Sequence, residues 1–175
     1  MRWIALLRAV NLGARNKVPM AELRKLLEAA GYEGVRTYIA SGNVILDGPT
    51  GRAAVAAELE RVVADSFGVS TTAILRKPRE LAATLDRHPF GADTSETHVA
   101  FLAKRPGKAA AARLEDAVGA HERAVLAGAD LYLLLPRGVH GAGLSAAKVE
   151  SLLEVRATMR NWRTVAALAQ LASGA

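Results

Sequence analysis

The sequence lacks cysteine, is poor in aromatic residues and contains no long apolar segment. Because none of the 175 residues is cysteine, disulfides, thiolate catalysis and thiolate metal sites are excluded, as is usual in a reducing cytoplasm. No run approaches the roughly 18 apolar residues that a membrane-spanning helix requires. The apolar start of the chain is interrupted by Arg8 and continues into a polar loop, which argues against a signal peptide. We therefore expect a cytoplasmic protein that does not enter a membrane.

The charge of the chain is positive. There are 23 Lys and Arg against 17 Asp and Glu, which gives a net charge of +6. Such a balance favours encounters with phosphates and acidic surfaces, so an anionic small molecule and a nucleic acid are both candidate partners. Aromatic residues make up only 5% of the sequence, and no strand pattern resembles that of an RNA-recognition motif. Binding of RNA or single-stranded DNA would therefore be mainly electrostatic.

The first half of the chain alternates strand and helix patterns. A nearly continuous apolar run at the start predicts a strand near the centre of a sheet, and residues repeating at helical spacing follow a proline. Ser, Gly and Asn then separate two β-rich runs, as in a hairpin. The expected elements are a strand over 2–10, a helix over 19–31, strands over 35–40 and 44–46, a helix over 50–67 capped by Thr50, a strand over 70–75 and a short helix over 78–85.

The second half repeats this order. THVAFLAK, residues 97–104, has the pattern of RWIALLRA, residues 2–9, and YIASGNVIL aligns with VLAGADLYLL so that Asn43 faces Asp130. Helices are expected over 107–118, over 146–153 with Ser145 as the cap, and from about Thr158 to Leu171. We predict an α+β fold of two pseudo-duplicated, ferredoxin-like (split βαβ) subdomains, with mostly antiparallel sheets and helices packed on one face. The connection over 88–96 divides the chain into subdomains over 1–90 and 91–175.

The loop RAVNLGARNKVP, residues 8–19, is the first candidate site. The second half turns the chain with fewer residues at the equivalent place, so the extra length is not needed for the turn itself. Backbone N–H groups before a helix, together with nearby cations and amides, can hold an anion. The alternative is a loop whose Asn side chains satisfy its own backbone. The candidate residues are Arg8, Asn11, Gly13, Arg15, Asn16 and Lys17.

Two further stretches are candidates for the same site. The hairpin residues Ser41, Gly42 and Asn43 are expected at the same edge as the end of the first strand, although they are also ordinary turn residues. In TMRNWRTV, the residues Arg160, Asn161, Trp162 and Arg163 are expected in the first turn of the closing helix, where cations oppose the helix dipole. A packed Trp is the alternative there. We hypothesise that the first loop and the start of the closing helix meet in one pocket for an anion.

The residues indicate no catalytic centre, and we expect no metal and no cofactor. The four His residues lack the spacing of metal ligands, and no acid–base pair can be recognised. A glycine-rich loop around His140 precedes Ser145 and Lys148, which could in principle form a Ser–Lys or His-assisted catalytic site. A solvated loop with Ser145 as the cap of the next helix is the simpler interpretation. Whether the protein is an enzyme stays open.

The loop over 8–19, the hairpin around Gly42 and the stretch TMRNWRTV together resemble the bacterial family known as domain of unknown function 1697. LLRAVNLGARNKVPMAELRKLLEAAGYEGVRTYIASGNVIL is similar to its N-terminal hallmark, and TMRNWRTVAAL to its C-terminal one. The resemblance implies two ferredoxin-like subdomains and no assigned activity. Ala9 and Ala14 stand where relatives commonly carry Gly, and Ala40 where they often carry Gln. The positions matching the family are Arg8, Asn11, Gly13, Asn16, Tyr38, Ser41, Gly42, Asn43, Arg160, Asn161, Trp162 and Thr164.

Three functions follow from these patterns. The first is a binding module for an anionic small molecule or nucleotide at the cleft between the subdomains. The second is an RNA or single-stranded DNA binding protein. The third is an enzyme acting on a phosphorylated metabolite through His140, Lys148 or Arg160.

Overall fold

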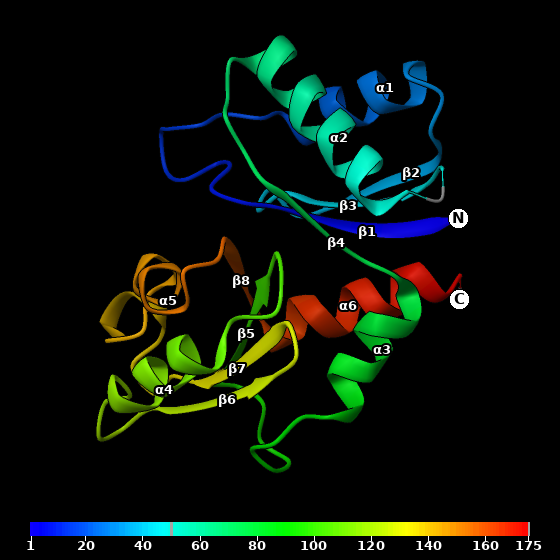
Figure 1. Cartoon of the computed structure of the whole chain (residues 1–175). Helices are drawn as coiled ribbons and strands as arrows, with labels where there is room; N and C mark the ends of the chain where they lie inside the picture. Colours follow the sequence, from blue (N-terminus) through cyan, green and yellow to red (C-terminus); the bar gives the residue numbers. More distant parts are fainter. Residues whose placement is uncertain (50, 175) are drawn as a thin grey trace. The chain divides into compact units, whose positions relative to one another are not determined.

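The computed structural model describes residues 1–49 and 51–174 (Figure 1). It contains two four-stranded sheets, and the chain divides into two compact units, Met1–Ala82 with Leu168–Ala175, and Ala83–Ala167. These units are defined by which residues contact one another in the fold. The division of the sequence between residues 90 and 91 stays a prediction. The predicted cap Thr50 lies outside the described residues. Within the described part, no helix is long and apolar enough to cross a bilayer.

The first unit has the predicted order of strands and helices. Its sheet has the order β2-β3-β1-β4, and all neighbouring strands are antiparallel. Helix α3 follows the last strand of this sheet and leads into the second unit. The elements are β1 (Arg2–Leu7), α1 (Met20–Ala29), β2 (Glu33–Tyr38), β3 (Asn43–Asp47), α2 (Arg52–Phe67), β4 (Ala73–Arg76) and α3 (Pro78–Asp86).

Strand β1 is buried on both faces, which explains its continuous apolar sequence. Because side chains alternate along a strand, Trp3 and Leu7 point into the core beneath α1 and α2, while Ile4 points to the opposite face and is also fully buried. Helices α1 and α2 lie on the same face of the sheet, as predicted (Figure 1). On the other side, Arg2 Nη1 donates a hydrogen bond of 3.2 Å to the carbonyl of Ala172 near the end of the chain.

The second unit repeats the topology of the first. Its strand order, β6-β7-β5-β8, is the order of the first sheet with each strand replaced by its counterpart. The register is repeated as well, since Leu6 pairs with Asn43 and Phe101 pairs with Asp130. The predicted duplication is thus confirmed. The elements are β5 (Thr97–Leu102), α4 (Lys108–Asp116), β6 (Arg123–Ala127), β7 (Asp130–Leu134), the 3₁₀ turn η1 (Val139–Gly141), α5 (Ala146–Leu153), β8 (Ala157–Asn161) and α6 (Trp162–Ser173).

The closing helix begins later than its sequence pattern predicts. Residues 157–161 form strand β8, which pairs with β5 from His98 to Leu102. Pairing with this strand, distant in the sequence, overrides the local helical pattern. Asn161 Oδ1 then accepts a hydrogen bond of 2.8 Å from the backbone N–H of Thr164, which is how an N-cap residue starts a helix. Arg160 and Asn161 therefore precede the helix instead of lying in its first turn.

Candidate functional site

The corner between β1 and α1 contains an unusual series of left-handed backbone conformations. Left-handed φ angles disfavour side chains other than Gly, Asn and Asp, and a β-branched residue there is an outlier. Of the five non-glycine residues with positive φ among those that the structure describes, four lie in this corner and in the adjacent β2–β3 turn. They are Ala9 at 56°, Asn11 at 53°, Asn16 at 52° and Ile39 at 49°.

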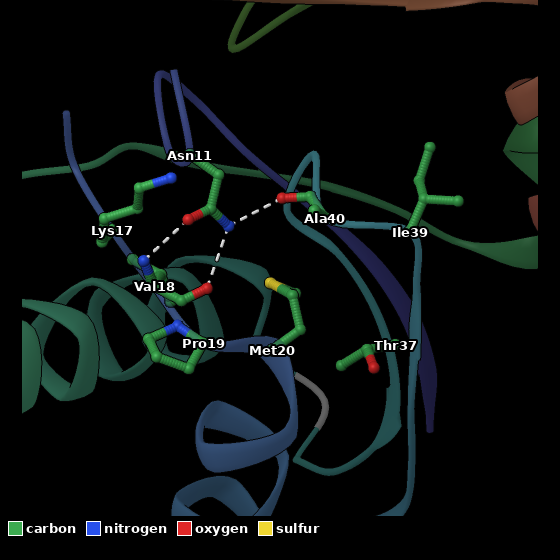
Figure 2. A pocket seen from close by; sticks show the side chains of 8 residues that line it. All are labelled: Asn11, Lys17, Val18, Pro19, Met20, Thr37, Ile39 and Ala40. Atoms are coloured by element: carbon green, nitrogen blue, oxygen red, sulfur yellow. Dashed lines mark hydrogen bonds between the residues drawn. The ribbon is translucent and has the colours of Figure 1, made fainter. Parts of the chain in front are cut away.

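Asn11 fastens the corner to its surroundings. Its Nδ2 donates hydrogen bonds to the carbonyls of Val18, at 2.9 Å, and Ala40, at 2.7 Å, and its Oδ1 accepts one of 2.8 Å from the N–H of Val18 (Figure 2). Both N–H groups of the amide and its oxygen are thus engaged. Asn16 closes the same loop through a hydrogen bond of 2.8 Å from Nδ2 to the carbonyl of Ala9. The side chain of Asn11 is therefore used to satisfy nearby backbone groups, as the alternative interpretation of this loop predicts.

The β2–β3 turn lies beside the end of β1, as predicted. The N–H of Leu7 donates to the carbonyl of Gly42 at 2.8 Å. Gly42 has a φ of +82°, and a Cβ atom there would lie 2.4 Å from Val10 Cγ2, so only glycine fits. Asn43 is fully buried, and its Nδ2 donates to the carbonyl of Tyr38 and to Ser41 Oγ. Asn43 therefore serves the turn itself. Strand β2 ends at Tyr38, earlier than expected, which places Ile39 in the turn.

A pocket of about 490 Å³, here called the corner pocket, opens between the start of α1 and this turn. Figure 2 shows Asn11 between the backbone of Val18 and Ala40, with Met20 nearby and Thr37 and Ile39 on the side of β2. Lys17 is the only charged residue in the lining, and it forms no ion pair with a described residue. The pocket is lined by Asn11, Lys17, Val18, Pro19, Met20, Thr37, Ile39 and Ala40.

Of the predicted site residues, the structure brings Asn11 and Lys17 together in the corner pocket. Arg8, Gly13, Arg15 and Asn16 belong to the same loop but do not line the pocket, and Ser41 and Gly42 lie in the adjoining turn. The side chain of Arg15 is exposed and forms no ion pair within the described part of the chain. Sequence reasoning missed the apolar lining and Thr37.

The segment around Arg160 has a structural role within the second unit. Arg160 is only 7% exposed, and its Nη1 donates to Thr158 Oγ1 at 2.7 Å and to the carbonyl of Met159 at 2.9 Å. Burial lowers the pKa of Arg160 to about 10, so the group stays charged at neutral pH. Trp162 packs against His88, with ring centroids 4.4 Å apart, as the packed-Trp alternative predicts. A meeting of this segment with the corner after β1 stays a prediction.

The glycine-rich loop of the second unit provides a helix cap. Ser145 Oγ accepts a hydrogen bond of 3.3 Å from the N–H of Lys148, which confirms the capping interpretation. His140 lies in the turn η1 and is exposed. No three His, Asp or Glu side chains gather as a metal site anywhere in the described ranges.

Two α+β units with the same topology, one of them carrying a strained corner pocket, define a duplicated fold of the ferredoxin-like class. The family described as "Protein of unknown function (DUF1697)" matches residues 1–132, and the chain belongs to this family. No curated protein matches the sequence. A solved structure, that of the conserved bacterial protein SP0830 from Streptococcus pneumoniae, is similar with a TM-score of 0.74 and 24% sequence identity, covering 98% of each chain. This likeness supports the fold over the whole chain.

Proposed function

We propose that this protein binds a small organic anion in the corner pocket. The observation that carries the proposal is the concentration of left-handed, non-glycine residues around that pocket. At Ala9 and Ile39 such a conformation costs on the order of 1–3 kcal/mol and persists because the surrounding structure enforces it, as is common at active sites and ligand clamps. Ile39 is the clearest case, because its strained backbone holds an apolar side chain that is 52% exposed.

The lining indicates the chemistry of the ligand. One cation, Lys17, and one hydroxyl, on Thr37, face a surface that is otherwise mostly apolar, and no carboxylate is present in the lining. A pocket of about 490 Å³ falls within the range of about 300–1,000 Å³ typical of ligand sites. An anion with an apolar body, such as an aromatic or alkyl carboxylate or a phosphate ester, would satisfy Lys17 and cover Met20 and Ile39.

Binding without catalysis fits this lining better than a reaction does. It contains no carboxylate, imidazole or serine that could serve as nucleophile or base. Asn11 would act as a positioning residue, because its hydrogen bonds hold the walls of the pocket in place. In our proposal the corner pocket alone holds the ligand, so that the cleft between subdomains is not required.

Nucleic-acid binding is the weaker candidate. A ferredoxin-like sheet binds single strands by stacking bases on exposed aromatic side chains. Here Trp3, Phe101 and Tyr132 are at most 1% exposed, and the one other aromatic residue on a described strand, Tyr38 at the end of β2, is half-buried. Any affinity for nucleic acid would then depend on phosphate contacts and would fall steeply as salt is raised.

The test is a thermal-shift and calorimetric titration of the full chain with benzoate, hexyl phosphate, inorganic phosphate and a thymidine oligonucleotide. We expect benzoate or hexyl phosphate to stabilise the protein and inorganic phosphate to bind more weakly, because it lacks an apolar body. Lys17→Met should weaken binding about 10- to 100-fold, the usual effect of losing a charge-assisted contact. Lys25→Met is the control, because Lys25 is exposed on α1 outside the pocket lining.

Two results would refute the proposal. One is the absence of any stabilisation by both organic anions, and the other is binding that Lys17→Met and Lys25→Met weaken equally. Salt-sensitive binding of the oligonucleotide alone would favour the nucleic-acid function instead.

A further inference from the structure

A second cavity lies in the second unit, between the turn after α4 and the loop after β7. It has a volume of about 220 Å³, and its lining includes one acidic residue, one arginine and three glycines. The cavity involves none of the residues of the corner pocket. Six of its lining residues matter here: Gly119, His121, Glu122, Pro136, Arg137 and Gly143.

The carboxylate of Glu122 is only half used by the fold. Its Oε1 accepts a hydrogen bond of 2.7 Å from the N–H of Gly143, which ties the two loops together. Its Oε2 is buried, and no described residue supplies it with a hydrogen bond. Leaving a buried carboxylate oxygen without a donor costs free energy, and native structures show few such groups. Oε1 alone ties the two loops together, so Oε2 keeps its capacity to accept a hydrogen bond.

Two glycines leave room around this oxygen. A Cβ atom on Gly119 or on Gly143 would lie 3.5 Å from Oε2, in van der Waals contact with it. Because neither residue has a side chain, only backbone covers Oε2 on these two sides, and a small separation of the two loops opens this oxygen to a donor in the cavity. The C-terminal end of α4, at Ala117, also lines the cavity, and the partial negative charge of a helix C-terminus favours a cation there.

The cavity also contains a positive group for a ligand of mixed charge. Arg137 is exposed at the same cavity, and it forms no ion pair with any residue in the described part of the chain. A ligand with an ammonium group at Glu122 Oε2 and a carboxylate at Arg137 would satisfy both charges. The volume of about 220 Å³ lies below the range of about 300–1,000 Å³ for drug-sized ligands, so the molecule must be small.

We propose that this cavity is a binding site for a small zwitterion of the α-amino acid class. The ammonium donates to Glu122 Oε2, and the carboxylate accepts from the guanidinium of Arg137. Pro136 provides an apolar contact for a short side chain. His121, which also lines the cavity, contributes a further donor.

The site can be tested by titrating the full chain with L-alanine and following backbone amide resonances. Propylamine and propionate, which carry one charge each, serve as half-ligands. We expect saturable shifts of the Gly119 and Gly143 amides with L-alanine, and at least about tenfold weaker binding of each half-ligand, because each satisfies only one charge.

Substitutions then assign the contacts. Glu122→Gln keeps an oxygen for the Gly143 N–H but removes the charge, so the fold should persist while L-alanine binding falls at least about tenfold. Arg137→Gln should have a similar effect, whereas Lys148→Gln, which removes an exposed cation outside the cavity lining, should have none. The Gly143 amide resonance in the unliganded variants reports whether the loops are intact.

The proposal is overturned if L-alanine causes no saturable shift, if Glu122→Gln with an intact Gly143 resonance binds L-alanine as tightly as the native chain, or if propylamine binds equally well. Lys17→Met should leave the L-alanine titration unchanged, so this site and the corner pocket succeed or fail separately.

Discussion

Replacing Asn11 by alanine should destabilise the first unit more than the same replacement of the other left-handed asparagine, Asn16. The substitution removes the hydrogen bonds to Val18 and Ala40, which fasten the corner to the start of α1 and to the β2–β3 turn. It also places alanine at a φ of +53°, a conformation that asparagine tolerates better. Both effects act on the folded state.

The expected magnitude follows from these contacts. Three hydrogen bonds at about 0.5–1.5 kcal/mol each would give roughly 1.5–4.5 kcal/mol, and the partial exposure of Asn11 favours the lower part of that range. The left-handed backbone adds about 1 kcal/mol. We therefore expect a loss of about 3 kcal/mol. Asn16→Ala is a matched control, because Asn16 has a φ of +52° but only one side-chain hydrogen bond, to the carbonyl of Ala9. Its loss should be about 1.5 kcal/mol.

The assay is urea unfolding followed by tryptophan fluorescence. The chain has two Trp residues, so a Trp162→Phe background leaves the buried Trp3 as the reporter of the first unit. Each Asn variant is compared with this background, and the unfolding free energies are obtained by linear extrapolation. If Asn11→Ala costs no more than Asn16→Ala, the hydrogen bonds of Asn11 do not stabilise the corner, and our account of it is wrong.

Three further outcomes are expected. Gly42→Ala should cost roughly 2–4 kcal/mol in the same assay, because its Cβ would collide with Val10 at a positive φ; wild-type stability would show that the turn relaxes freely. The hydrogen bond and charge of Arg2 lower the pKa of Asp47, so this carboxylate stabilises the fold above about pH 4, its ordinary pKa, and the contribution is lost as pH falls through the lowered value. Asp47→Asn should therefore flatten the dependence of the urea midpoint on pH below 4, and an unchanged slope would contradict the assignment. Ser145→Ala should cost about 1 kcal/mol through loss of the helix cap, measured by thermal unfolding, and Ser145→Asn, which keeps a capping oxygen, should restore most of it.

The duplicated fold could be predicted because its strongest signals are local. The apolar runs of β1 and β5 and the turn residues before Asn43 and Asp130 are readable without knowing their partners, and they recur in the same order. Strand β8 was not predicted, although its apolar residues Ala157 and Met159 alternate with polar ones, because it is only five residues long and leads directly into the helical pattern of the closing helix. Only its pairing with β5, distant in the sequence, determines its conformation.

The candidate site could be predicted only in part. The length and composition of the loop after β1 pointed to Asn11 and Lys17, which line the corner pocket. The sequence does not reveal that the Asn11 amide is engaged by backbone, because this depends on how closely Val18 and Ala40 approach. The left-handed bend at Ile39 is equally hidden, since a β-branched residue is the opposite of what such a bend favours.

The first unit consists of two segments that are far apart in the sequence, and this affects how the protein folds as it is synthesised. This unit joins Met1–Ala82 to Leu168–Ala175, and the carbonyl of Ala172 accepts a hydrogen bond from Arg2 in the first strand. The N-terminal sheet therefore emerges from the ribosome long before the segment that completes its contacts. Its opposite face must wait, incompletely covered, until residues 168–175 have been synthesised, and during that interval a chaperone has its best opportunity to bind the nascent chain.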